Sequence, residues 1–320
     1  MNKVKLHLNY AGYCLSNAKH VVKGDKSKLI KFNALFALIL HPTKGYVLFD
    51  TGYTQRFFDA TKNFPNKIYA LATKVNLDKS EEVKSQLESH GISSDDINHI
   101  IISHFHADHI GGLKDFKKAK FYCTKKSYNQ VTSISDYFAF SKGILKQLIP
   151  SDFNDRVFFI ENNSSLVNDN IFGHAYDLFN DGSIKVYNLP GHAAGQIGIH
   201  IQTIKKDYFL LADACWDKRA IFNDKYPSKI VKLFFDSWND YMSSLNKIKQ
   251  YNNQFPNTIL VPTHCSKTTD DLVSNKITFD YILESIDLIY PSIEIHNLVF
   301  NGEAPNGAEL LANNAIHAGV

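Results

Sequence analysis

Five short apolar runs of the chain each end close to an acidic or imidazole side chain. They are residues 46–49 before Asp50, 100–102 before Ser103 and His104, 184–187 before His192, 208–212 before Asp213, and 259–263 before His264. Runs this short, rich in β-branched residues and bounded by Gly or Pro, are typical of buried strands. Loops that carry chemistry follow the C-terminal ends of strands in layered α/β folds. The pattern therefore predicts five strands that deliver site side chains.

Helical patterns alternate with these strands. Residues 80–90 and 235–251 carry apolar side chains at helical spacing, and each is expected to pack on a sheet. Residues 36–40 precede a Pro-to-Gly turn at 42–45, which is typical of an antiparallel strand pair. We therefore predict an α/β fold with two mixed β-sheets flanked by helices. The aromatic-rich segment 125–171 is predicted to be an inserted helical region.

The composition is that of a globular chain with one large core or two modest ones, since 44% of its 320 residues are hydrophobic and 21% are charged. This apolar share excludes a disordered chain, and the lack of Gly or Pro periodicity excludes a fibre. The longest apolar run, residues 34–40, is far shorter than the roughly 18 residues of a membrane span, and residues 1–12 do not resemble a signal peptide. A formal charge of +3 is too mild to indicate a nucleic-acid surface. We therefore expect neither a membrane nor a nucleic acid as partner.

The four cysteines, Cys14, Cys123, Cys215 and Cys265, are far apart and form no CxxC pair. At this chain length a disulfide scaffold is not expected, so they are interpreted as reduced thiols of a cytoplasmic protein. The 14 histidines are the unusual figure, and the question is whether some of them cluster.

One string of the sequence concentrates metal-binding side chains. His104, His106, Asp108 and His109 stand within six residues and are followed by Ile110 and two glycines. Two histidines that are two residues apart at the end of an extended strand project to the same side, where they can share one ion. Asp108 and His109 follow where the chain must turn, so their side chains can face a second ion beside the first. Zinc binds His nitrogen and carboxylate oxygen, and catalytic zinc sites keep one position for water. The two glycines are expected to let the backbone bend closely into a helix.

With these motifs in order, the chain resembles the metallo-β-lactamase-fold hydrolases over roughly residues 3–270. Five motifs match: Asp50, the HxHxDH string, His192, Asp213 and His264. The resemblance implies an αββα sandwich with a dinuclear metal site between the sheets. It also implies the ligands: His104, His106 and His192 for the first metal, Asp108, His109 and His264 for the second, and Asp213 bridging both. Asp50 matches an aspartate that orients a ligand histidine through its ring N–H.

Within this superfamily, residues 11–15, 48–52 and 190–196 resemble segments of the N-acyl homoserine lactonases, the quorum-quenching group. The resemblance implies a small-molecule lactone or ester as substrate. Trp216 stands where these enzymes usually have a tyrosine that hydrogen-bonds the substrate carbonyl. An indole N–H can donate a hydrogen bond but cannot act as an acid. Ala107 likewise stands where several lactonases carry a larger apolar residue.

The expected reaction is hydrolysis of a lactone or ester. Two close divalent ions, foremost zinc, with iron, manganese and cobalt left open, lower the pKa of a bridging water and polarise a carbonyl. A metal-bridging hydroxide would attack the carbonyl carbon, Trp216 would support the carbonyl oxygen, and Asp108 or Asp213 would relay a proton. Aromatic residues around 137–140, together with the N-terminal loop, could form a groove for an acyl chain or could be plain helical core.

Other functions of the same superfamily compete with this one. The string HADHIGGL also resembles phosphodiesterases and RNA-processing nucleases, although the basic cluster within 114–126 is local. A thioester hydrolase of the glyoxalase type shares HxHxDH, but no C-terminal basic substrate-binding pattern is present. A flavodiiron-type oxidoreductase would carry Glu in place of His106. A non-catalytic binding protein is disfavoured because the ligand set is complete.

The predicted domain organisation is simple. Residues 1–295 form one hydrolase domain that includes the insertion at about 125–171. Residues 296–320 form a C-terminal tail, and residues 301–320 within it are rich in Ala, Asn and Gly. The apolar insertion could form the contact face of a homodimer.

Overall fold

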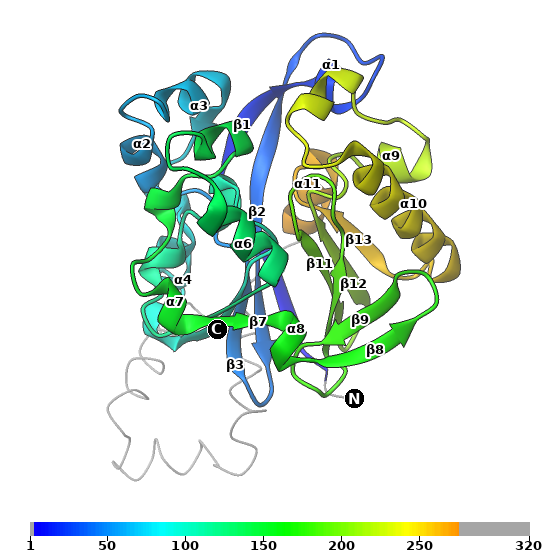
Figure 1. Ribbon diagram of the computed structural model, residues 1–320. Helices are drawn as coiled ribbons and strands as arrows, with labels where there is room; N and C mark the ends of the chain where they lie inside the picture. Colours follow the sequence, from blue (N-terminus) through cyan, green and yellow to red (C-terminus); the bar gives the residue numbers. More distant parts are fainter. Residues whose placement is uncertain (1–2, 275–320) are drawn as a thin grey trace, which may run out of the picture. The chain divides into compact units, whose positions relative to one another are not determined.

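The computed structural model describes residues 3–274, which form two mixed β-sheets covered by helices (Figure 1). The predicted domain end near residue 295 and the predicted tail, 296–320, lie outside the described residues. Among the residues described, no helix is long and apolar enough to cross a membrane.

The first sheet has seven strands in the order β4-β1-β2-β3-β5-β6-β7. Their bounds are β1 Lys5–Asn17, β2 Leu29–His41, β3 Gly45–Phe49, β4 Lys74–Asn76, β5 Ile97–Ile101, β6 Lys120–Cys123 and β7 Val157–Phe159. Strands β3, β5, β6 and β7 are parallel, whereas β4, β1, β2 and β3 pair antiparallel. The antiparallel pair predicted around the turn at 42–45 is therefore confirmed as β2 and β3.

The second sheet has six strands in the order β13-β12-β11-β10-β9-β8. Their bounds are β8 Ser165–Asp169, β9 Gly173–Asp177, β10 Ile184–Asn188, β11 Ile197–Gln202, β12 Asp207–Ala212 and β13 Ile259–Pro262. Only β12 and β13 pair in parallel. The five strands predicted from the apolar runs are β3, β5, β10, β12 and β13, and all five are confirmed.

One apolar core joins the two sheets. Val47 and Phe49 of the first sheet are fully buried in the same cluster as Ile199 and Leu210 of the second. Each side chain of this kind stabilises the fold by about 1.5–3 kcal/mol when it is fully buried. The strands that lead to the predicted site are therefore held firmly by apolar packing on their shared face.

The helices cover the outer faces of the sheets. Their bounds are α1 Ala18–Val21, α2 Arg56–Ala60, α3 Lys67–Ala72, α4 Val83–Glu88, α5 Ala107–Ile110, α6 Lys125–Ser133, α7 Phe153–Arg156, α8 Ile160–Asn163, α9 Arg219–Phe222, α10 Trp238–Gln254 and α11 Ser266–Ser274. The helix predicted at 235–251 is α10, which packs on the second sheet in a cluster with Phe209. The helix predicted at 80–90 is split, because the extended backbone of Glu82 separates the 3-10 turn η1 (Lys79–Glu81) from α4.

The segment predicted as a helical insertion, 125–171, contains α6, α7 and α8, and it also contains two edge strands. Strand β7 extends the first sheet in parallel with β6, and β8 extends the second sheet antiparallel to β9. The three residues of β7 are too few to show an alternating pattern, so their conformation depends on the neighbouring strand. The segment therefore closes one edge of both sheets and is not wholly helical.

Candidate metal centre

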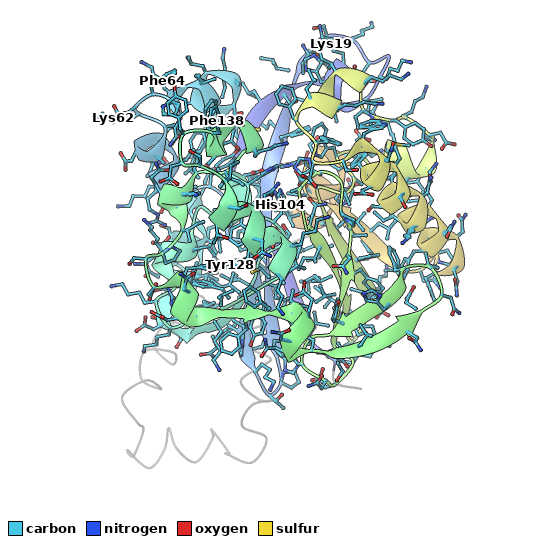
Figure 2. All side chains as sticks on the ribbon, in the orientation of Figure 1. Lys19, Lys62, Phe64, His104, Tyr128 and Phe138 are labelled. Carbon is cyan, nitrogen blue, oxygen red and sulfur yellow. The ribbon has the colours of Figure 1, made fainter. Side chains whose placement is uncertain are left out.

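The side chains predicted as ligands converge at the C-terminal ends of strands from both sheets. His104 lies three residues after β5, Asp213 directly follows β12, and His264 lies two residues after β13. His192 lies in the loop that joins β10 to β11. Figure 2 labels His104 between the strands of the two sheets, in the interior of the described part of the chain.

Seven side chains form two groups that could each hold a metal ion. Within each group the candidate ligand atoms all lie within 4.8 Å of one another. The first group is His104, His106, His192 and Asp213, and the second is Asp108, His109 and His264. All seven predicted ligands are thus brought together, and all are buried except the half-buried His106.

Asp213 lies between the two groups. Its Oδ2 is 3.1 Å from Nε2 of His192 in the first group and 2.9 Å from Nε2 of His264 in the second. Its Oδ1 is 3.4 Å from Nε2 of His109. Asp213 therefore contacts histidines of both ligand groups.

Hydrogen bonds on the outer side of two rings decide which nitrogen faces the centre. Nδ1 of His109 donates to Oδ2 of Asp50 at 2.7 Å, and Nδ1 of His264 donates to the carbonyl oxygen of Asn33 at 3.0 Å. A neutral imidazole carries one N–H, so Nε2 of each ring presents its lone pair inward. Asp50 itself accepts bonds from the N–H and the hydroxyl of Ser103, each at 2.7 Å. Asp50 therefore lies behind His109, as the resemblance implied.

Several polar atoms of the seven side chains lack a hydrogen-bond partner. Nε2 of His104, Nε2 of His109, Nδ1 of His192 and Oδ1 of Asp213 are buried without a hydrogen-bond partner among the described residues. Nε2 of His264 lies 2.9 Å from Oδ2 of Asp213, a separation at which either a proton on the ring or a metal ion must stabilise the pair. An unpaired buried polar atom costs about 1–3 kcal/mol, and a cation that takes the lone pairs removes this cost. The set of imidazole nitrogens and carboxylate oxygens therefore fits zinc or a similar divalent ion.

The pKa values divide the five histidines into two sets. Burial lowers the pKa of His104, His106 and His192 below the ordinary value, so these rings stay neutral and keep a lone pair. Burial also opposes charge on His109 and His264, but the neighbouring carboxylates outweigh it and raise their pKa. A proton and a metal ion compete for the same lone pair, so these two rings lie where positive charge is most favoured.

The backbone is strained where two strands deliver site residues. Asp50, directly after β3, has φ +58°, and Ala212, directly before Asp213, has φ +47°. A residue other than Gly in this left-handed region costs of order 1–3 kcal/mol and persists only where its surroundings impose it. Such strain is typical of functional sites.

Two glycines let the backbone pack directly on the site. A Cβ on Gly111 would lie 2.5 Å from the carbonyl oxygen of Gly52, and one on Gly143 (φ +70°) would lie 2.7 Å from the ring of His106. Gly111 follows α5 with an ordinary helical φ of −56°. Its lack of a side chain therefore serves this close approach and not the predicted bend into a helix.

Trp216, predicted to contact substrate, lies beside the centre. Its indole N–H donates to Oδ2 of Asp213 at 3.3 Å. Its ring packs edge-on against His192, Phe235 and Phe32 at centroid distances of 5.0–5.6 Å. In this structure the indole supports the carboxylate, and its role toward a substrate carbonyl stays a prediction.

Sequence reasoning missed a phenol next to the ligand string. Tyr69 in α3 lies close to Ala107, which stands between His106 and Asp108. Burial, reinforced by the charge of Asp108, raises the pKa of Tyr69, so the phenol stays protonated and can donate. Burial likewise raises the pKa of the nearby Cys14 thiol to about 12. A single aromatic residue in a six-residue helix gave no signal in the sequence, and neither did Asn33, which acts through its backbone.

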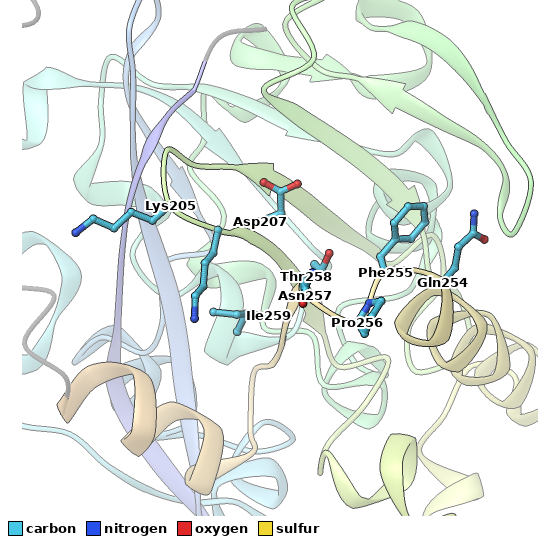
Figure 3. Close-up of a pocket in the computed structure, with 9 residues that line it drawn as sticks. Lys205, Asp207, Gln254, Phe255, Pro256, Asn257, Thr258 and Ile259 are labelled. Atoms are coloured by element: carbon cyan, nitrogen blue, oxygen red, sulfur yellow. The ribbon is translucent and has the colours of Figure 1, made fainter.

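Among the cavities outside the ligand groups, two have volumes of about 500 Å³ or more. One, of about 500 Å³, is lined in part by Phe64, Pro65 and Tyr137. It lies between the α2–α3 region and the aromatic residues around 137–140 that were predicted to line a groove. The other, of about 810 Å³, is formed at the start of β12 and the connection from α10 to β13, with Lys205 and Phe255 among its lining residues (Figure 3). No predicted site residue lines the second cavity, so it is separate from the candidate metal centre.

Comparison with known families and proteins gives a consistent result. The sequence profile described as the Metallo-beta-lactamase superfamily matches residues 33–264. This range contains every predicted ligand together with Asp50 and Asn33.

The curated relatives include N-acyl homoserine lactonases. The N-acyl homoserine lactonase AttM of Agrobacterium fabrum is 24% identical over 226 residues, which cover 70% of this chain and 79% of that protein. The N-acyl homoserine lactonase of Bacillus cereus is 24% identical over 232 residues, which cover 71% and 82%. A shorter match, 31% identical over 90 residues, links 27% of this chain to 27% of the probable metallo-hydrolase Rv2300c of Mycobacterium tuberculosis.

Two solved structures share the architecture. An N-acyl homoserine lactone hydrolase with N-hexanoyl-L-homoserine at its catalytic metal centre superposes with a TM-score of 0.65, at 18% identity, over 84% of this chain and 96% of that one. The dizinc quorum-quenching lactonase AidC gives a TM-score of 0.57, at 17% identity, over 82% and 87%. At these identities the likeness shows the fold, and the predicted αββα sandwich is confirmed.

Proposed function

The chain belongs to the metallo-β-lactamase superfamily of metal-dependent hydrolases, and from this premise we propose that it opens a lactone or another carboxylic ester. We further propose two divalent metal ions, foremost zinc, and N-acyl homoserine lactones as the leading substrate class. The observation that carries the proposal is the position of Asp213, whose carboxylate oxygens lie within 3.4 Å of histidine nitrogens from both ligand groups.

The proposed ligands divide as the two groups do. His104, His106 and His192 would hold one ion, Asp108, His109 and His264 would hold the other, and Asp213 would bridge them. When bound, the two ions supply a nucleophilic water near neutral pH and a Lewis acid for the substrate carbonyl.

The two carboxylates suit different tasks. Burial opposes the charge of Asp213, but the neighbouring imidazoles, foremost His264 and then His192, outweigh burial and hold its pKa well below the usual range. A carboxylate that stays ionised is a good bridge and a poor proton acceptor. We therefore assign the proton relay, from the attacking water to the leaving alcohol, to Asp108, whose Oδ2 lies 3.5 Å from Nε2 of His264.

The tyrosine that lactonases usually carry at position 216 is absent, and Tyr69 offers a phenol from another element. Tyr69 lies close enough to Ala107 and Asp108 for both to influence its pKa, and its ring packs edge-on against Phe57 at a centroid distance of 5.7 Å. We assign Tyr69 as a hydrogen-bond donor to the substrate carbonyl. The Tyr69→Phe variant is expected to lose about tenfold in kcat/KM with unchanged metal content, because one neutral hydrogen bond to substrate is worth about 0.5–1.5 kcal/mol. Steady-state kinetics with metal analysis would measure this, and equal kcat/KM would contradict the assignment.

The substrate class rests on two supports. Curated relatives that cover about 70% of the chain are N-acyl homoserine lactonases. The second support is the aromatic pair Phe64 and Tyr137, whose rings meet edge-on at a centroid distance of 6.2 Å. The pair lines a cavity of about 500 Å³ whose other walls are largely polar, and we propose that an acyl chain packs against the two rings.

The test combines metal analysis with a substrate panel. The protein would be purified, its metals measured, and the same sample given short- and long-chain N-acyl homoserine lactones, an aryl ester, a thioester and a phosphodiester. Lactone opening that is lost on chelation and restored by zinc is the expected result. Metal-dependent turnover of the phosphodiester or thioester, with no lactone or ester turnover, would contradict the proposal.

A further inference from the structure

Two segments that are far apart in the sequence form one surface at the end of the molecule where the candidate site lies. The segments are residues 17–31, which join β1 to β2, and residues 217–234, which precede α10. The N–H of Lys23 donates to the carbonyl oxygen of Tyr226 at 2.8 Å, and that of Ser228 donates to the carbonyl oxygen of His20 at 2.9 Å. We call this surface the basic apolar face, and Figure 2 labels Lys19 on it.

The face is strongly basic relative to the rest of the chain. Its two segments hold ten Lys or Arg residues and three Asp, a formal charge of +7, whereas the whole chain carries +3. Eight of the lysines are exposed: Lys19, Lys23, Lys26, Lys28, Lys31, Lys225, Lys229 and Lys232.

The acidic residues of the face are already occupied. Asp25 and Asp217 both pair with Arg219, at 3.0 and 2.8 Å, and Asp224 pairs with Lys249. Within the described residues, no ion pair is found for the eight exposed lysines, of which Lys31 and Lys232 lie over aromatic rings. The positive charge is therefore available to an external anionic surface.

Large apolar side chains stand exposed among these lysines. Leu29, Phe222, Ile230, Leu233 and Phe234 are each more than half exposed, and Leu233 reaches 79%. The 3-10 turn η6 (Lys229–Leu233) alternates them directly with lysines. Exposed apolar groups gathered in one place mark an interaction surface and not ordinary scatter.

The chemistry of the face favours one kind of partner. Protein interfaces are depleted in Lys, and their cores exclude charge, so eight lysines disfavour a second protein. The lysines could bind the phosphates of a nucleic acid, but the exposed Leu, Ile and Phe side chains would then remain in water. An anionic lipid surface accepts both, because headgroups meet the lysines while apolar side chains enter the acyl boundary.

The face also adjoins the candidate metal centre. Val21, Val22 and Phe32 form a small buried cluster against which Trp216 packs. Phe32 in turn stacks on His264 at 4.6 Å. A ligand that entered from this surface would meet the site after one layer of side chains.

We propose that the basic apolar face docks this protein on membranes that expose anionic lipid headgroups, with lysines at the headgroups and Leu233 and Phe234 inserted at the acyl boundary. Docking of this kind needs no apolar run long enough to span a bilayer. The expectation of no membrane partner was drawn from the lack of a spanning segment, whereas the proposal concerns a surface assembled from two separate segments. The proposal does not depend on the reaction catalysed.

The test uses the full chain and sedimentation with vesicles. Vesicles of phosphatidylcholine alone are compared with vesicles that contain phosphatidylglycerol, at low and high salt. Binding is expected only with phosphatidylglycerol, and it should weaken as salt increases. The Lys26→Gln/Lys28→Gln variant should bind roughly tenfold or more weakly, because each lysine near an anionic surface contributes severalfold to the partition coefficient.

Matched controls separate the face from general surface effects. The Lys114→Gln/Lys117→Gln variant removes two exposed lysines outside the face and should bind like the unmodified protein. Leu233→Ser/Phe234→Ser should abolish the binding that survives high salt, whereas Leu166→Ser/Ile204→Ser, at positions about as exposed, should not. Thermal unfolding and metal content of each variant would show that the fold is intact.

Several outcomes would overturn the proposal. They are equal sedimentation with neutral and anionic vesicles, or equal losses in the face variants and their controls. Size-exclusion chromatography would reveal whether the protein is a dimer that the Leu233→Ser/Phe234→Ser substitutions dissociate. Such a dimer, together with a lack of vesicle binding, would identify a second copy of the chain as the partner of the face. Stronger binding to duplex DNA or RNA than to anionic vesicles would identify a nucleic acid instead.

Discussion

Buried histidines gather at two opposite ends of the strands, and their hydrogen bonding differs. Beside the turn between β2 and β3, His41, the last residue of β2, is fully buried, and its Nε2 lies 2.9 Å from Oδ2 of Asp181 and 3.0 Å from Oγ of Ser183. Its Nδ1 accepts the N–H groups of Thr43 and Lys44, each at 3.2 Å. At the candidate metal centre, by contrast, Nε2 of His104, Nε2 of His109 and Nδ1 of His192 are buried without a hydrogen-bond partner among the described residues.

This difference separates a structural histidine from a candidate ligand. Both nitrogens of His41 have partners, so the ring acts as a link between the first sheet and the loop before β10. Asp181 and Ser183 contact the same nitrogen, so His41 cannot relay a proton between them as in a catalytic triad. A histidine cluster indicates a metal only where lone pairs converge and remain unpaired.

The largest expected effect is that of Asp213→Asn. The substitution removes the charge shared by both ligand groups, so bound metal should fall from two equivalents to one or fewer. The rate of lactone or ester hydrolysis should fall by about 10³-fold. Elemental analysis and kinetics on one sample would measure both, and retention of two ions with full activity would refute the bridging role.

Asp50 and Asp181 form a matched pair, because each contacts a buried histidine at 2.7–2.9 Å. Asp50→Asn should lower metal affinity or activity by about 10–100-fold, since it disturbs the orientation of His109. Asp181→Asn should leave both unchanged. Metal titration of the two variants would measure this difference. Equal losses of metal affinity would show that the His41 site and the candidate metal centre do not differ in the way proposed.

His41→Ala tests the structural end directly. The variant loses its bonds to Asp181 and Ser183 and its edge contact with Phe179, so the free energy of unfolding should fall by about 1–3 kcal/mol. Metal content and kcat should not change. Urea unfolding of the metal-loaded protein provides the measurement, and a loss of metal would show that the two ends are coupled.

The smallest effect concerns pH and His99, which contacts Tyr122 and Phe179 near His41. Burial, followed by the charge of Lys120, lowers the pKa of His99 to about 4. The unfolded chain, with a pKa of about 6.5, binds this proton first, so stability falls as pH drops from about 6.5 to about 4. In His99→Gln this part of the decline should be missing. Unfolding free energies of both proteins across this range, with metal removed, would show it, and parallel pH curves would contradict it.

Much of the fold was predictable because its signals are local. The strands before Asp50, His104 and Asp213 are short apolar runs with a polar end, and burial on both faces of a sheet requires that pattern. The edge strands within 125–171 were not predictable. Their few residues take a strand conformation only because β6 and β9 offer open hydrogen-bonding edges.

The candidate site was predictable to a similar degree. Spacing placed His104 and His106 on one side of a strand end, and the order of motifs implied the remaining ligands. Tyr69 of α3 and the carbonyl oxygen of Asn33 in β2 could not be predicted in this way, because only tertiary packing brings them to the site. The position of Asp213 between both groups likewise depends on how the two sheets meet.

By itself, the sequence determined which side chains can bind a metal and at which strand ends they stand, because residue type and local periodicity are properties of the chain. The tertiary structure decided which lone pairs face the centre, which carboxylate lies between the groups, and that residues 17–31 and 217–234 form one surface. These are distances between atoms of remote segments, and only the packing of the two sheets on their shared core sets them.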